Sequence, residues 1–146
     1  MKKIAICLVT ITLLLLSGCE KGFDYRNKWE GNYEVKMKTV SGDVVVQNDE
    51  NPTGYLTVEK NADDEMNFKF FFYGDGNWYD ACYNFHVDKK GNISSDLKYR
   101  SGVDGCFIKR DSLVLTLEEH GHNASNQHTY YCKKTKKDIH DVVSEQ

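Results

Sequence analysis

Apolar and polar residues alternate with period two along most of the chain after Trp29, and turn-forming residues interrupt the alternation at short intervals. Period two places successive side chains on opposite faces of a strand, so one face can be buried while the other meets water. The alternation is clearest where Phe68, Phe70 and Phe72 share one face. The pattern predicts eight or nine short strands, over residues 32–40, 44–47, 55–60, 66–73, 78–88, 93–100, 106–108, 112–118 and 128–133.

The strands follow one another with short connections and without a convincing helix. One buried and one wet face is the pattern of antiparallel sheet, and short sequential links favour a meander. A meander of this length hides its edges by closing on itself. We therefore expect an all-β fold: an antiparallel up-and-down meander of 8–9 strands that closes into a small barrel over residues 29–134. Residues 119–127 should form a polar loop, and residues 135–146 a charged tail.

The first residues form a separate unit. Lys2 and Lys3 precede an apolar run over residues 4–16, which is too short for a bilayer-spanning helix of about 20 residues and fits a secretory signal. The run ends in Leu16-Ser17-Gly18-Cys19, which resembles the lipobox of bacterial lipoproteins. An ordinary signal with a chance cysteine is the alternative.

The lipobox resemblance implies a signal peptide over residues 1–18 and lipidation of Cys19 with palmitate-type acyl chains. Such chains hold a protein on a membrane permanently. Residues 19–28 would then be the lipidated cysteine and a polar tether. The location would be the cell envelope, and Glu20 favours the outer membrane because it is not the aspartate that retains some lipoproteins in the inner one.

The net charge of the chain excludes some classes of binding partner. The formal charge of the chain is −3, and loss of Lys2 and Lys3 lowers it to −5. A nucleic-acid binder would show a basic patch or stripe, so we expect no nucleic-acid partner. An acidic domain is also poorly suited to anionic lipid surfaces, so membrane contact should run through the lipid alone.

Three stretches resemble small lipocalin-like lipoproteins of bacteria. Trp29-Glu30-Gly31-Asn32-Tyr33 opens the first strand with a glycine beside aromatics, and the stretches 101–105 and 111–115 resemble the later half of these proteins. The likeness spans residues 29–134 in layout. It departs from true lipocalins because Trp29 precedes Gly31, and because no C-terminal helix is evident. The resemblance implies a non-enzymatic binder of a small apolar ligand.

Cys82, Cys106 and Cys132 remain after Cys7 is removed and Cys19 is acylated. An exported location permits disulfides, but three thiols form at most one bridge within the chain, and sequence does not fix the pairing. We expect the pair Cys82–Cys106. Without a CxxC motif, neither a redox site nor a thiolate zinc site is indicated.

Inward-facing aromatics are the candidate ligand contacts. They would line a pocket for an apolar ligand, although the same rows could equally form a plain barrel core. The candidates are Phe68, Phe70, Phe72, Tyr79, Tyr83 and Phe85.

The alternative function is protein binding, as in an inhibitor, an immunity protein or an accessory subunit of an envelope complex. It would use an exposed patch of Phe71, Tyr73 and Trp78.

Metal binding, cofactors and catalysis have little support. His120, His122 and His128 lie around a polar loop that does not fix a metal-ligand spacing, so we expect neither metal nor cofactor. The chain has no Gly-x-Ser-x-Gly, P-loop or HExxH motif, and we expect no enzyme. Cys82 and His86 are four residues apart on one strand, roughly 13 Å, too far for a thiolate–imidazole pair.

Overall fold

The computed structural model describes residues 24–42, 44–48, 53–62, 64–74, 77–95, 102–120, 125–137 and 139. The predicted signal segment and Cys19 lie outside these ranges. Within them, a 3-10 helix, η1 (Tyr25–Lys28), is followed by nine strands. The strands are β1 (Gly31–Ser41), β2 (Val44–Asn48), β3 (Gly54–Lys60), β4 (Glu65–Gly74), β5 (Asn77–Val87), β6 (Asn92–Ser94), β7 (Val103–Ile108), β8 (Ser112–His120) and β9 (Ser125–Thr135).

The strands form one antiparallel sheet that closes on itself. Their order is β2-β1-β3-β4-β5-β6-β7-β8-β9, and the additional pairing of β1 with β9 closes an eight-stranded barrel that leaves β2 as an extra strand. The prediction of an all-β, antiparallel up-and-down meander of 8–9 strands that closes into a small barrel is confirmed. β1 takes two partners on one edge: residues 31–35 pair with β3, and residues 38–41 pair with β2.

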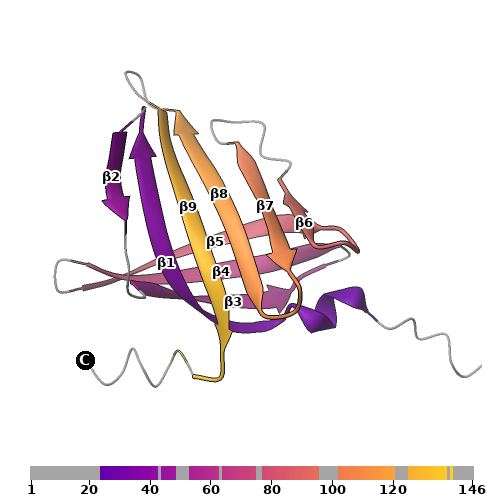
Figure 1. The fold of residues 1–146 in the computed structure, drawn as a ribbon. Coiled ribbons are helices and arrows are strands. Elements are labelled where there is room, and N and C mark those ends of the chain that lie inside the picture. Colours follow the sequence, from indigo (N-terminus) through magenta and orange to yellow (C-terminus); the bar gives the residue numbers. More distant parts are fainter. Residues whose placement is uncertain are drawn as a thin grey trace, which may run out of the picture.

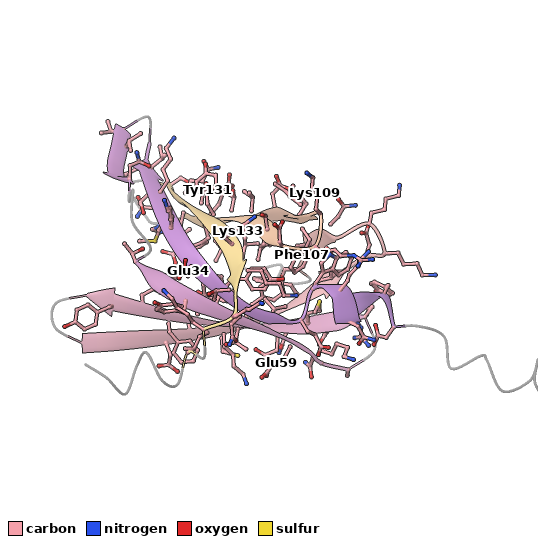
Figure 2. The ribbon with its side chains drawn as sticks, turned by 60° about the horizontal axis from the view of Figure 1, so that its bottom comes forward. Glu34, Glu59, Phe107, Lys109, Tyr131 and Lys133 are labelled. Atoms are coloured by element: carbon pink, nitrogen blue, oxygen red, sulfur yellow. The ribbon has the colours of Figure 1, made fainter. Side chains whose placement is uncertain are left out.

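The barrel is flattened into two leaves. In Figure 1, β3, β4 and β5 run across behind β1, β9, β8 and β7. β6 links the leaves on one side, with only His86↔Ser94 and Val87↔Ile93 in register on β5. Figure 2 shows Phe107 between the leaves and Glu59 on the outer side of the lower one. The period-two pattern therefore sorts side chains into the interior and the surface, as alternation requires.

The core fills the space between the leaves with apolar side chains. Fully burying one such side chain contributes roughly 1.5–3 kcal/mol, so this layer is the main source of stability. The largest of its fully buried side chains are Trp29, Tyr33, Phe68, Phe70, Phe85, Leu56, Met66, Leu113, Leu115, Val35, Val58 and Val87.

η1 covers one end of the barrel, which we call the closed end. Asp24 caps the helix by accepting a hydrogen bond from the Arg26 amide at 3.0 Å. The Tyr25 hydroxyl donates to the Val87 carbonyl at 2.7 Å, and the Arg26 guanidinium donates to the Glu65 carbonyl at 3.0 Å. The structure differs from the tether predicted over residues 20–28 at residues 24–28, where the Tyr25 and Arg26 side chains find acceptors on the barrel.

The ends of the last two strands also differ from the sequence-based expectation. β8 runs to His120 and β9 starts at Ser125, so the predicted polar loop is shorter than residues 119–127. β9 ends at Thr135, the Lys137 ammonium lies 2.7 Å from Glu34 Oε1, and Ile139 is only 3% exposed. The start of the predicted tail therefore packs on the barrel.

Cys82, Cys106 and Cys132 are free thiols, so the predicted Cys82–Cys106 bridge is wrong. Cys106 pairs with Asn92, which follows the turn after Asp88, whereas Cys82 lies about six strand residues, roughly 20 Å, before that turn. A disulfide needs Cα atoms closer than about 7 Å. The pairing register, which sequence spacing does not reveal, keeps the two thiols apart.

The three thiols should differ in reactivity. Cys82 is exposed, Cys106 is half-buried, and Cys132 is buried with its pKa raised by burial, which disfavours the reactive thiolate. Iodoacetamide should modify Cys82 first and Cys132 only after unfolding in urea, as measured by peptide mass spectrometry. A Cys82–Cys106 peptide recovered without reductant would contradict this assignment.

Gly91 is a close-packing position at the closed end. Its φ is +96°, and a Cβ there would lie 2.9 Å from Trp29 Cζ2 and 3.1 Å from Phe107 Cβ. The indole of Trp29 is stacked on Phe107 with a centroid distance of 4.9 Å, so neither ring can move away freely. Only glycine combines this backbone conformation with the close approach.

Gly91→Ala should lower the free energy of unfolding by about 3 kcal/mol, combining backbone strain with overpacking. Gly42→Ala is the matched control, because Gly42 also has a positive φ of 58° but no atom within 4 Å of the added Cβ. It should cost about 1 kcal/mol, from backbone strain alone. Urea unfolding followed by tryptophan fluorescence measures both, and equal losses would refute the packing argument.

Candidate ligand-binding end of the barrel

The predicted ligand-lining aromatics divide into two groups. Phe68, Phe70 and Phe85 are 0%, 1% and 1% exposed, and the Phe68 ring lies edge-on to Phe85 with centroids 5.1 Å apart. Phe68 also meets Phe107 at 6.1 Å. Phe68 and Phe85 are therefore enclosed by other rings and belong to the core, one of the two interpretations that the sequence left open.

Phe72 lies nearer the opposite end, which we call the open end. Tyr83 is in register with Phe68 and stacks on Phe85, and both Phe72 and Tyr83 are only partly buried. Phe70 touches both: its ring centroid is 5.6 Å from Phe72 and 6.1 Å from Tyr83. The backbone of Tyr79 pairs with Phe72, but the Tyr79 side chain is outside the described part of the structure. The open end thus has an aromatic floor with incompletely covered rings.

The other leaf adds Tyr130, which the candidate list did not include. Its ring centroid is 5.0 Å from Phe70 and 5.7 Å from Phe72, so it completes the aromatic floor. Met37 pairs with Tyr130 across β1 and β9 and is partly buried. The alternation of Tyr130 with Cys132 on β9 was the signal that could have identified it.

Two further apolar side chains, Leu117 on β8 and Val103 on β7, lie between Tyr130 and the open end. Leu117 is 7% exposed and pairs with Val103 on β7, which is partly buried against the core. These side chains come from strands that lie side by side in Figure 1. The open end is therefore apolar on both leaves.

A polar group stands at the rim. Thr39 Oγ1 and His128 Nδ1 are 3.0 Å apart, within hydrogen-bond distance, and Thr39 is only 7% exposed. His128 Nε2 lies 4.0 Å from Glu119 Oε2, and the Glu119 side chain is 69% exposed. Glu119 continues the inward series Leu113, Leu115 and Leu117, so it belongs to the inner face of β8.

Burial and the negative charge of Glu119 raise the pKa of two tyrosine hydroxyls, those of Tyr83 and Tyr130. Burial raises the pKa of Tyr83, and the Glu119 carboxylate raises it further. Burial, then Tyr83 and then Glu119 raise the pKa of Tyr130 in the same way. Both phenols therefore stay neutral at physiological pH and keep their hydroxyl hydrogens.

Three hollows lined by described residues lie on the outer face of the sheet. One of about 260 Å³ is bordered by Glu34, Lys36, Val114, Tyr131 and Lys133, which point away from the barrel interior. The other two, of about 340 Å³ and 240 Å³, lie over β6, β7 and β8 and over β7, β8 and β9. Their linings mix exposed, half-buried and buried residues of these strands.

The patch predicted for a protein partner is described only in part. Tyr73 is 48% exposed and Phe71 is half-buried, but the Trp78 side chain is outside the described residues.

The described residues contain no group of three His, Cys, Asp or Glu side chains placed to hold a metal ion. His122 and the side chain of His120 are outside them. Nor does any helix in the described ranges have the length and apolarity needed to cross a membrane.

The described residues form a closed eight-stranded barrel with η1 over one end, and this fold resembles solved lipocalin structures. Among solved structures, a lipocalin whose expression is activated by the myc oncogene in cell transformation aligns with a TM-score of 0.54 and 8% identity, over 82% of this chain and 78% of that one. An odorant-binding protein from bovine nasal mucosa aligns at 0.49 and 14%, over 86% and 83%. Its complex with undecanal aligns at 0.49 and 13%.

The first of these alignments shows a lipocalin-like fold, and at such low identity it shows the fold alone. No family model matches the chain, and a search of curated proteins gives no match.

Proposed function

We propose that this protein is a lipid-anchored, lipocalin-like lipoprotein of the bacterial cell envelope that binds a small apolar ligand without transforming it. The observation that carries the proposal is the contrast between the two barrel ends. The closed end is covered by η1 and the buried Trp29, whereas Phe72, Tyr83 and Met37 face inward at the open end and stay partly exposed.

Apolar lining with a few polar groups at its edge is the usual composition of a small-molecule site. Eight-stranded barrels have interiors just wide enough for side chains or one small ligand. Here the rings of Phe68, Phe85 and Phe107 occupy the lower interior. The ligand would therefore sit on the aromatic floor of Phe70, Phe72, Tyr83 and Tyr130, rather than deep in the barrel.

Lipid attachment is part of the same proposal, and it rests on the sequence Leu16-Ser17-Gly18-Cys19. Two or more acyl chains on Cys19 would hold the protein on a membrane without a spanning helix. The outer membrane is favoured over the inner because Glu20, rather than aspartate, follows the cysteine.

Met37→Trp tests the ligand site by filling the open end. It should weaken binding of N-phenyl-1-naphthylamine, an apolar fluorescent probe, by at least about tenfold, equivalent to roughly 1.4 kcal/mol. Lys36→Trp is the matched control, because the neighbouring side chain points outward and is exposed. Fluorescence titration gives both affinities, and urea unfolding checks that both variants fold. Equal affinities would place the probe elsewhere and refute the site.

Cys19→Ala tests the anchor. In bacteria expressing the full chain, the unchanged protein should take up radiolabelled palmitate and partition into the detergent phase of Triton X-114, and the variant should do neither. Cys7→Ala is the control, because Cys7 belongs to the segment that processing would remove. Undiminished labelling of the Cys19→Ala protein would show that the lipobox interpretation is wrong.

A further inference from the structure

We propose that the open end selects amphiphiles whose head group donates hydrogen bonds and carries no negative charge, such as an aliphatic amine or alcohol, and disfavours carboxylates. This inference rests on the proposed function, because it assigns the ligand chemistry of the same site. The observation behind it is that one carboxylate, Glu119, and two neutral phenols, Tyr83 and Tyr130, lie on the inner face of the barrel beside the aromatic floor.

Glu119 sets the sign of the charge at the open end. It lies on the inner face of β8, within 4.0 Å of His128 Nε2, and its charge reaches Tyr83 and Tyr130. The lysines on the neighbouring strands, Lys36 on β1 and Lys133 on β9, alternate outward. Among the described residues, Glu119 is therefore the charge that a ligand at this end meets.

The one inward-facing lysine of β9 does not offset that charge. Lys134 lies at the closed end, where its ammonium donates to the Lys28 carbonyl at 3.3 Å and stands 5.7 Å from the centre of the Tyr33 ring. The aromatic core, including Phe70 and Phe107, separates it from the open end. Among the described residues, a carboxylate head at the open end would thus meet Glu119 and His128 but no lysine or arginine, and like charges at close range repel.

A donating head group finds acceptors at the same place. The distance of 4.0 Å from Glu119 to His128 exceeds hydrogen-bond length, so this contact leaves the carboxylate oxygens able to accept from a ligand. The Tyr83 and Tyr130 hydroxyls add two acceptors that can also donate. A protonated amine would gain attraction to the electron-rich faces of the tyrosine rings as well.

The apolar part of the ligand would extend over the aromatic floor. The partly exposed Phe72 stacks on the buried Phe70 with centroids 5.6 Å apart, and Tyr130 meets both rings, so an apolar layer of which Phe72 is the exposed part lies below the polar rim. Met37 and Leu117 close the sides from the other leaf. Rim and floor together match an amphiphile with one polar end.

The test compares three ligands that share a ten-carbon chain: decylamine, decanol and decanoate. Each competes with N-phenyl-1-naphthylamine for the unchanged protein at pH 7.5, below its critical micelle concentration. Decylamine and decanol should displace the probe at concentrations about tenfold lower than decanoate. Added salt should weaken decylamine but leave decanol unchanged, because only the charged head is screened.

Glu119→Gln should reduce decylamine affinity about threefold to fivefold, the range expected for a largely exposed charge pair, and should improve decanoate binding. Glu118→Gln is the matched control: Glu118 lies on the outer face of β8, where it accepts a hydrogen bond from Gln127 at 3.1 Å. The control should leave all three affinities unchanged. Because Glu119 is 69% exposed, its substitution should leave the fold intact, as urea unfolding will show.

The outcomes separate the two proposals. If neither the probe nor any ten-carbon ligand binds, the proposed function fails. If the ligands bind but decanoate equals or exceeds the others, or if Glu118→Gln and Glu119→Gln act alike, ligand binding stands and the head-group assignment is overturned.

Discussion

The pairing of β1 with β9 is the constraint on which the rest of the structure depends. It joins the first and last strands of the chain in continuous register, from Asn32↔Thr135 to Ser41↔Asn126. Closure removes the open edges that a meander would otherwise expose, and it defines an inside for every alternating strand. Tyr33, Val35, Tyr130 and Cys132 are buried because of this pairing. The aromatic floor exists because closure brings Tyr130 across to the Phe70 and Phe72 of the other leaf.

Side-chain size then makes the two ends of the barrel different. At the closed end, Trp29 stacks on Phe107, and Gly91 leaves just enough room for both rings. At the open end, β1 exchanges β3 for β2 as its partner, and the smaller side chains of Thr39 and Val103 take the interior positions. One end is therefore solidly packed, whereas the other leaves aromatic faces incompletely covered.

The sequence predicted what alternation alone determines. Most strand positions, the inward face of Phe68, Phe70, Phe72, Tyr83 and Phe85, and the closed antiparallel architecture follow from period two and short turns. The exceptions are the strand predicted over residues 93–100, of which the structure describes only β6, and the strand predicted over residues 106–108, which begins at Val103.

Prediction from the sequence was wrong where the structure depends on the register between distant strands or on a single side-chain contact. The Cys82–Cys106 bridge depends on how β5, β6 and β7 align, and residues 24–28 pack on the barrel because Tyr25 finds the Val87 carbonyl. Glu119 fell in the predicted polar loop over residues 119–127, and only the β8–β9 pairing places it on a strand, near His128.

The position of η1 determines which end of the barrel lies nearer to Cys19. Its cap, Asp24, is five residues after Cys19, a span of at most about 17 Å when fully extended. If Cys19 carries lipid as proposed, the closed end stands next to the bilayer and the rim of Thr39 and His128 points away from it. Cargo would then enter from the surrounding aqueous compartment rather than laterally from the host membrane. Such a protein would be suited to capturing dilute amphiphiles from solution or receiving them from a carrier.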